Sequence, residues 1–146
     1  MFSYQILNHP EKFTLDTSRI QMIFERIDEM VDIPQKGILD IAFLSDTEIQ
    51  ALNRDHRGID KTTDVLSFHY FEDFTDVADD DIAGEIILSE SRILTQAEEY
   101  GHTAEKEFET LVIHSILHII GFDHETDEDY EAMWSYEEPL RKEILI

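Results

Sequence analysis

The sequence has no cysteine, few basic residues and no apolar run long enough to span a membrane. Without cysteine the chain forms neither disulfides nor a zinc site with thiolate ligands, and this absence suits a reducing compartment. The N-terminus lacks the basic start and apolar stretch of a secretory signal. The longest mostly apolar stretch, residues 111–122, is too short to cross a bilayer. We therefore expect a soluble, cytoplasmic protein without a membrane partner.

Basic residues are scarce, since 11 lysines and arginines face 34 aspartates and glutamates, which gives a formal net charge of -23. A surface of this sign repels phosphodiester backbones on average and argues against a generic nucleic-acid binder. Three of the eleven basic residues nevertheless fall within eight positions, namely Arg54, Arg57 and Lys61. Because local charge can differ from net charge, this short stretch could still contact phosphate groups.

The length of 146 residues suits one domain, residues 1–146, with its own core. Periodicity and capping signals predict strands at 4–7, 38–44, 65–70 and 85–88, and helices at 17–31, 45–52, 91–100, 103–121 and 127–145. We expect helix N-caps at Thr17 or Ser18, at Ser45 with Glu48 in a capping box, and at Thr103, and a helix end at Gly101.

Between the predicted strands, residues 72–83 read as a mobile acidic loop. Strands mixed with helices, without strict alternation, favour an α+β fold around a small mixed sheet.

Three histidines have the spacing of metal ligands. His114 and His118 are one turn apart on a predicted helix, so both rings project from one face and can take two corners of a zinc tetrahedron. A straight helix would carry a third ligand past the metal, but Gly121 can adopt the left-handed turn that brings His124 back to it. Three neutral histidines leave a fourth position open, which is typical of catalytic zinc. We predict one Zn²⁺ ion at this site.

The same spacing occurs in metzincin proteases, whose pattern is H-E-x-x-H-x-x-G-x-x-H. In those enzymes the glutamate after the first histidine is the general base. Here Ser115 stands in that position, and a hydroxyl cannot hold or pass a proton as a carboxylate does at neutral pH. A metallopeptidase is therefore an alternative in which the ligands fit and the base does not.

Three motifs resemble the YbeY family of rRNA-maturation endoribonucleases. The family pattern H-G-x-L-H-L-x-G-Y-D-H stands at 114–124 as HSILHIIGFDH, R-G-x-D-K-P-T-D-V-L-S-F stands at 57–68 as RGIDKTTDVLSF, and G-D-I-x-I-S stands at 84–89 as GEIILS. The similarity runs in order over roughly residues 40–140, and two long motifs together are highly specific. The departures from these patterns, among them Thr62, Glu85, Ser115 and Phe122, remove neither a predicted metal ligand nor Arg57.

The resemblance implies a metal-dependent, single-strand-specific endoribonuclease that matures the 3′ end of small-subunit (16S) rRNA and takes part in ribosome quality control. It implies single-stranded RNA and the ribosome or its assembly factors as partners, and not DNA. It also implies a mixed sheet with an antiparallel edge strand lining the cleft, packed by several helices, and a metzincin-like metal-binding helix. A non-catalytic ribosome-associated module, in which zinc only stabilises the fold, is a further hypothesis.

Arg57 is the predicted catalytic residue outside the metal site. Its guanidinium fork could clamp the scissile phosphate with two hydrogen bonds while negative charge develops there, and it matches the arginine of the family motif. Lys61 and Arg54 could hold flanking phosphates, although a solvated loop is the simpler interpretation of Arg54.

The sequence does not identify the base that activates water. Glu85, Glu107 and Asp123 are candidates, but each is more typical of a group that orients a ligand histidine or caps a helix. The remaining histidines have no ligand spacing and are interpreted as structural or surface residues; they are His9, His56, His69 and His102. His69 alone could reach the cleft.

Overall fold

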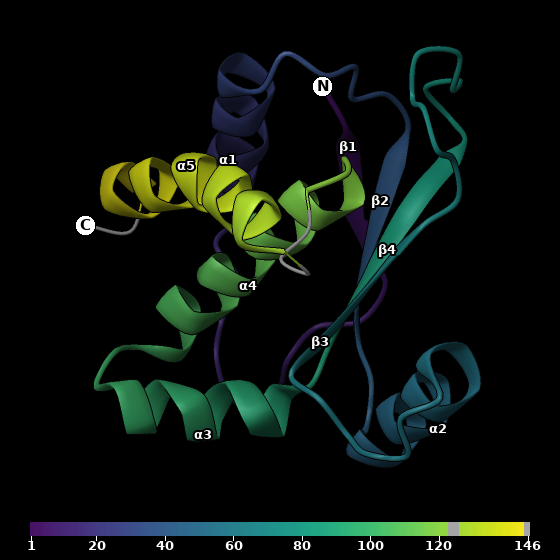
Figure 1. Cartoon of the computed structure of the whole chain (residues 1–146). Coiled ribbons are helices and arrows are strands. Elements are labelled where there is room, and N and C mark those ends of the chain that lie inside the picture. Colours follow the sequence, from purple (N-terminus) through teal and green to yellow (C-terminus); the bar gives the residue numbers. More distant parts are fainter. Residues whose placement is uncertain (123–125, 145–146) are drawn as a thin grey trace.

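The computed structural model describes residues 1–122 and 126–144. Its elements are β1 (Ser3–Ile6), α1 (Thr17–Met30), β2 (Ile38–Phe43), α2 (Asp46–Arg57), β3 (Val65–His69), β4 (Ile82–Leu88), α3 (Glu90–Tyr100), α4 (Ala104–Ile119) and α5 (Asp127–Ile144) (Figure 1). The predicted α+β class is confirmed. None of the helices in the described ranges is long and apolar enough to cross a membrane.

The four strands form one mixed sheet in the order β1-β2-β4-β3. Strands β1, β2 and β4 run parallel, whereas β3 pairs antiparallel with β4 at the edge. This confirms the antiparallel edge strand that the family resemblance implies. Strand β4 begins at Ile82, three residues earlier than predicted. The prediction began the strand after Gly84, but this glycine is itself paired within the sheet, with Leu39 of β2 and His69 of β3.

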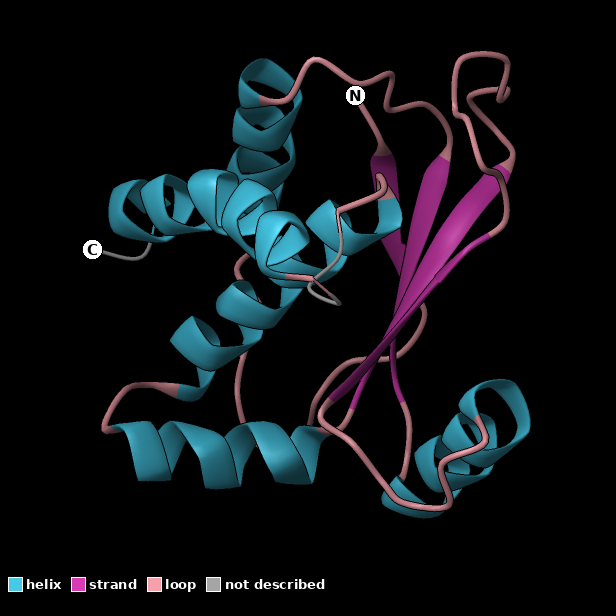
Figure 2. Ribbon diagram, in the orientation of Figure 1, coloured by secondary structure: helices cyan, strands magenta, loops and turns pink. Residues whose placement is uncertain are grey.

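One face of the sheet carries the main core. Side chains from the sheet, from α1 and from α4 pack there with Met133 and Leu140 of α5, and Figure 2 shows these helices together on one side of the sheet. On the opposite face α2 covers one end of the sheet through a small separate cluster formed by Ile49, Leu66 and Ile87. Each large apolar side chain buried in this way contributes about 1.5–3 kcal/mol. Helix α4 is thus held against the sheet, which positions the histidines.

Helix α1 begins with a different cap from the one predicted. Its N-cap is Asp16, whose carboxylate accepts hydrogen bonds from the backbone N–H groups of Ser18 and Arg19, so the prediction of Thr17 or Ser18 is wrong. A carboxylate is both an acceptor and a favourable charge at the positive end of the helix. The other predicted caps are confirmed: the Ser45–Glu48 capping box, Gly101 after α3 and Thr103 before α4.

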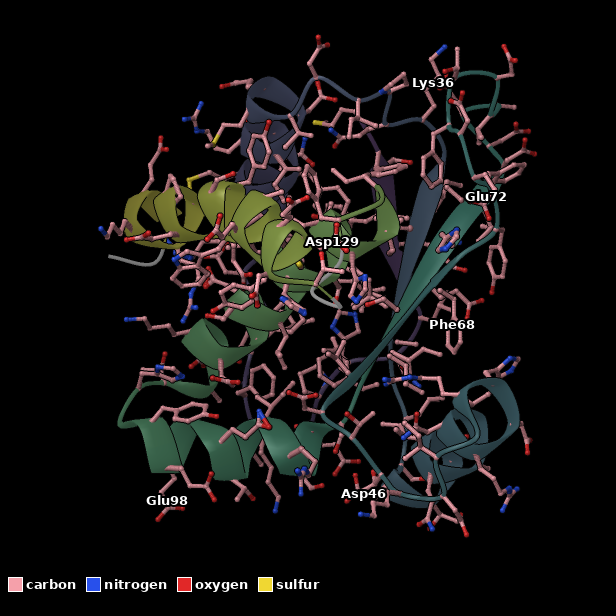
Figure 3. The ribbon with its side chains drawn as sticks, viewed as in Figure 1. Lys36, Asp46, Phe68, Glu72, Glu98 and Asp129 are labelled. Atoms are coloured by element: carbon pink, nitrogen blue, oxygen red, sulfur yellow. The ribbon has the colours of Figure 1, made fainter. Side chains whose placement is uncertain are left out.

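The acidic segment between β3 and β4 is anchored to the core rather than wholly solvated. Phe74 and Val77 are buried, and the Phe74 ring meets Phe2 edge-on with centres 5.2 Å apart. The acidic side chains remain exposed; Glu72 marks the start of the segment in Figure 3. The expectation of a mobile loop over 72–83 is therefore corrected: two apolar side chains hold it, and its last two residues belong to β4.

Candidate active site

Helix α4 presents two of the predicted metal ligands side by side. The ring centres of His114 and His118 are 5.8 Å apart, and their planes stand at 85°. With metal–nitrogen bonds of about 2.1 Å and tetrahedral angles, two imidazoles on one zinc ion have ring centres about 5 Å apart. The pair therefore fits two positions around a single ion.

The chain turns back after α4 where the sequence predicts it. Gly121 has φ +115°, a conformation that side chains with a Cβ rarely adopt. The N–H of Phe122 donates to the carbonyl of Leu117 at 3.0 Å, which closes the turn. The third predicted ligand, His124, lies outside the described residues, and residues 1–122 and 126–144 by themselves contain no group of three side chains arranged to hold an ion.

A carboxylate from α5 lies against the first histidine. Oε2 of Glu137 is 3.3 Å from Nδ1 of His114, and the Glu137 side chain is buried. Such a carboxylate fixes the tautomer and the orientation of a ligand histidine. Sequence reasoning missed Glu137 because no local pattern relates α5 to α4. The one hint in the sequence is that Glu137 lies at helical spacing between two apolar residues, Met133 and Leu140, which the structure shows to be buried.

A cavity of about 560 Å³ opens beside His114. It follows α4 back from His114 toward the N-terminal end of the helix, where Glu107 lies two turns earlier on the same face. Its polar wall comes from three helices, one turn and the residue before β3: Gln96 of α3, Glu107 of α4, Arg141 of α5, His102 of the α3–α4 turn, and Asp64. A cavity of this size and polarity, lined by the first imidazole of the pair, can admit a polar substrate.

A chain of hydrogen bonds forms one wall of this cavity. Gln96 Nε2 donates to Oδ2 of Asp64 and to Oε2 of Glu107, each at 3.1 Å. The other oxygen of Glu107 is 2.7 Å from Nε2 of His102. Glu107 is only 3% exposed, so both its oxygens need these partners. The chain ties α3, α4 and the start of β3 together.

Comparison with known proteins identifies the family. Residues 5–144 match the sequence model of the family described as Endoribonuclease YbeY. The chain belongs to this family.

Relatives named Endoribonuclease YbeY cover most of the chain. The protein from Clostridioides difficile is 41% identical over 108 residues, covering 73% of this chain and 71% of that protein. The protein from Caldicellulosiruptor saccharolyticus is 35% identical over 144 residues, covering 91% of both. The solution structure of TM1509 from Thermotoga maritima aligns with a TM-score of 0.55 at 28% identity, covering 98% of this chain and 91% of that one. None of these supports the metallopeptidase alternative.

In this YbeY-family protein the basic cluster lies apart from the cavity wall. Arg57 is the last residue of α2 and is exposed; it is not among the described residues that line the cavity. The ring of its neighbour His56 meets Phe68 of β3 with centres 5.2 Å apart, which places the end of α2 against the edge strand. Arg54 is solvent-exposed and pairs with Asp55 at 3.2 Å. It lies in helix α2 and not in the expected solvated loop, because this helix continues to Arg57, five residues beyond its predicted end.

The three candidate bases have different surroundings. Glu107 shares the cavity with His114, but its hydrogen bonds go to His102 and Gln96. Glu85 alternates with the core residue Ile86, so it faces the side of the sheet opposite α4. Partial burial and a hydrogen bond to Glu85 raise the pKa of Tyr70 to about 12. Asp123 lies outside the described residues.

Two of the histidines set aside in the sequence lie near the site. His102 is half-buried, pairs with Glu107 and lines the cavity, so the interpretation as a structural residue is confirmed and its place in the cavity wall is new. His69 is exposed at the end of β3, on the same strand face as Val65, which also lines the cavity. Its Nδ1 is 3.1 Å from the carbonyl oxygen of Phe71.

Proposed function

We propose that this protein is a metal-dependent endoribonuclease that cleaves single-stranded RNA beside His114 and His118. The observation that carries the proposal is the imidazole pair on α4, of which His114 contacts Glu137 and lines a polar cavity, in a chain of the endoribonuclease YbeY family. We propose Zn²⁺ as the ion, held by His114, His118 and His124. Zinc would supply Lewis-acid chemistry for phosphodiester hydrolysis.

The chain's own residues have separate tasks in this proposal. Glu137 keeps Nδ1 of His114 occupied, so that the ring presents Nε2. The Asp64–Gln96–Glu107–His102 wall keeps β3 and α3 at a constant distance from α4, which preserves the width of the cavity. Arg57, at the end of α2, holds a phosphate of the strand through its planar fork.

The biological substrate follows from the family resemblance. We propose the 3′ end of small-subunit (16S) rRNA as the substrate, in the cytoplasm, with a role in ribosome quality control and with the ribosome or its assembly factors as partners. The resemblance includes the arginine block at 57–68, and Arg57, Gly58 and Lys61 stand there as in the family pattern.

The test combines metal analysis with RNA cleavage. Purified protein should bind one zinc ion and cleave single-stranded RNA but not duplex RNA, and a chelator should abolish cleavage. His114→Ala should lose zinc and activity together. Arg57→Ala should keep zinc and lose at least about a hundredfold in cleavage rate, whereas Arg54→Ala, the matched arginine on the same helix, should cleave normally.

Two results would contradict the proposal. Intact RNA after incubation with zinc-loaded protein would exclude hydrolysis at this site and would favour the non-catalytic module. Cleavage of a denatured casein substrate that stops with a chelator would favour a metallopeptidase instead.

A further inference from the structure

Helix α5 carries a row of planar side chains that leads away from the candidate site. Tyr130, Trp134, Glu137 and Arg141 are spaced by four, three and four residues, so they share one face of the helix. Glu137 of this row contacts His114, and Arg141 lines the cavity. The row is therefore continuous with the site, and Figure 1 shows α5 crossing in front of α4.

The two aromatic rings of the row are nearly parallel, and the guanidinium of Arg141 lies over one of them. The rings of Tyr130 and Trp134 are inclined by 10°, with centres 6.5 Å apart. The guanidinium carbon of Arg141 lies 5.6 Å from the centre of the Trp134 ring, a cation–π distance. Tyr130 is 54% exposed, and the other two are half-buried. The row thus offers flat apolar surface to solvent next to the cavity.

The surroundings of the row hold it in place. The indole N–H of Trp134 donates to the carboxylate of Glu138, which Lys142 pairs at 2.8 Å. Lys142 and this hydrogen bond lower the pKa of Glu138. Among the described residues no carboxylate pairs with Arg141, although 34 of the 146 residues are acidic. Its guanidinium, which lies over the indole of Trp134, can therefore donate hydrogen bonds to a phosphate or a base edge.

The net charge makes such a surface useful for binding RNA. A protein at -23 repels the phosphate backbone at long range, so affinity has to come from contacts that do not depend on a basic patch. Unpaired bases stack on aromatic rings and on guanidinium planes, and each stacked base contributes substantially to affinity without regard to sequence. In a duplex the base faces are hidden, so the same contacts are lost.

We propose that Tyr130, Trp134 and Arg141 form a stacking surface for the unpaired bases of the RNA strand that enters the site. This inference rests on the proposed function, because it assigns the substrate strand a path along α5. It also gives a preference for single strands a physical cause that is independent of the metal.

The test uses Trp134 itself, which is the only tryptophan in the chain. An oligouridine of about twelve nucleotides, titrated in the presence of a chelator to prevent cleavage, should quench Trp134 fluorescence to saturation. Tyr130→Ala and Arg141→Lys should each weaken binding about tenfold, the second without loss of charge. With fluorescently labelled RNA, Trp134→Ala should weaken binding and Trp134→Phe should restore most of it.

Matched controls separate stacking from charge and from general surface changes. Tyr70→Ala removes a tyrosine of almost equal exposure, 53%, on the β3–β4 connection, and Lys36→Ala removes an exposed cation on the segment between α1 and β2; both should bind RNA as the wild type does. Equal quenching by duplex RNA, or unchanged affinity in Tyr130→Ala and Arg141→Lys, would overturn the stacking surface.

Two results distinguish an incorrect stacking surface from an incorrect assignment of hydrolysis. Normal cleavage by Tyr130→Ala with an unchanged KM would overturn the stacking surface and leave hydrolysis intact. Saturable, Tyr130-dependent quenching by a protein that cleaves no RNA with zinc bound would support the stacking surface and overturn the proposed hydrolysis.

Discussion

At the residue scale, Ser115 marks the position at which this protein differs most clearly from the metzincin proteases. Metzincins place their general base at this position, directly after the first ligand histidine. In this protein the Ser115 side chain is 0% exposed and lies in the core side of α4, and its hydroxyl has no hydrogen-bond partner among the residues that the structure describes. A carboxylate there would be buried without a partner, at high cost. The position therefore does not serve catalysis here.

Replacing this hydroxyl should stabilise the protein. Ser115→Ala removes a buried polar group without a partner and improves helix propensity, so we expect the free energy of unfolding to rise by about 1 kcal/mol. Urea denaturation followed by circular dichroism measures it. Ser115→Gly is the matched control and should unfold more easily than Ser115→Ala by about 1 kcal/mol. A less stable Ser115→Ala would mean that the hydroxyl does have a partner.

At the scale of the elements, the approach of β3 to β4 sets one side of the cavity. A Cβ at Gly84 would overlap the carbonyl oxygen of Phe68 and would lie 3.3 Å from Cδ2 of Leu39. Both neighbours belong to adjacent strands, so neither can move without disturbing the sheet. The glycine of the G-E-I-I-L-S segment is thus explained by strand packing.

Gly84→Ala should therefore weaken the sheet. We expect the free energy of unfolding to fall by about 2–3 kcal/mol, the usual cost of overpacking a tight site, measured by urea denaturation. Gly101→Ala is the control, because a Cβ there meets nothing within 4 Å and only the backbone conformation at φ +69° is strained; its cost should be about 1 kcal/mol. Equal losses in the two variants would contradict the packing argument.

Asp46 joins two helices and makes their docking depend on pH. Its carboxylate accepts hydrogen bonds from Ser89 Oγ at 2.5 Å and Ser91 Oγ at 2.6 Å, linking the start of α2 to the start of α3; Figure 3 labels Asp46 at this end of the sheet. Both hydrogen bonds lower the pKa of Asp46, and the one from Ser89 has the larger effect. The native state therefore holds this proton less tightly than the unfolded chain does.

Because the pKa of Asp46 is lowered in the native state, acidification should remove the stabilisation that Asp46 provides. The stabilisation by Asp46 should be complete above its unfolded pKa, near 4, and should disappear as the pH falls through the lower native value. Asp46→Asn should cost about 1 kcal/mol at pH 7, and the difference from wild type should shrink below pH 4. Urea denaturation across this range measures it, with Asp79→Asn, in the exposed acidic loop, as the control. A difference that grows on acidification would contradict the assignment.

At the scale of the whole molecule, the net charge of -23 governs both stability and RNA binding. Most carboxylates are exposed and repel one another, and of the three clustered basic residues Arg54 is already paired with Asp55. The protein therefore has few cations with which to displace counterions from RNA.

Two salt effects of opposite sign should result. Added salt should raise the melting temperature, because screening weakens the repulsion among carboxylates. RNA affinity should fall only gently with salt, with a slope of log K against log salt of roughly −1.5 to −2, as two or three phosphate contacts to a single strand predict. Fluorescence titrations at several salt concentrations measure the slope. A steep slope would reveal a basic surface that the sequence does not suggest.

The sequence alone determined the order and type of the helices and strands, most caps, the α+β class and the pair of histidines on one face of α4, because all of these depend on local periodicity, capping chemistry and spacing. The motif blocks identified the family. The N-cap Asp16 was missed because three residues that can cap a helix follow one another at 16–18. The burial of Phe74 and Val77 was missed because the acidic residues around them suggested an exposed loop.

Only the tertiary structure decided which distant side chains meet the imidazole pair. Glu137 reaches His114 across 23 residues, and Gln96 joins Asp64 to Glu107 from a third element. Burial decides such contacts, because a carboxylate or an amide in the core must find a partner wherever the packing of helices brings one, and no spacing along the chain records that packing. Helical spacing alone puts Trp134 and Arg141 on one face of α5, but only the packing of this helix brings Arg141 to the cavity.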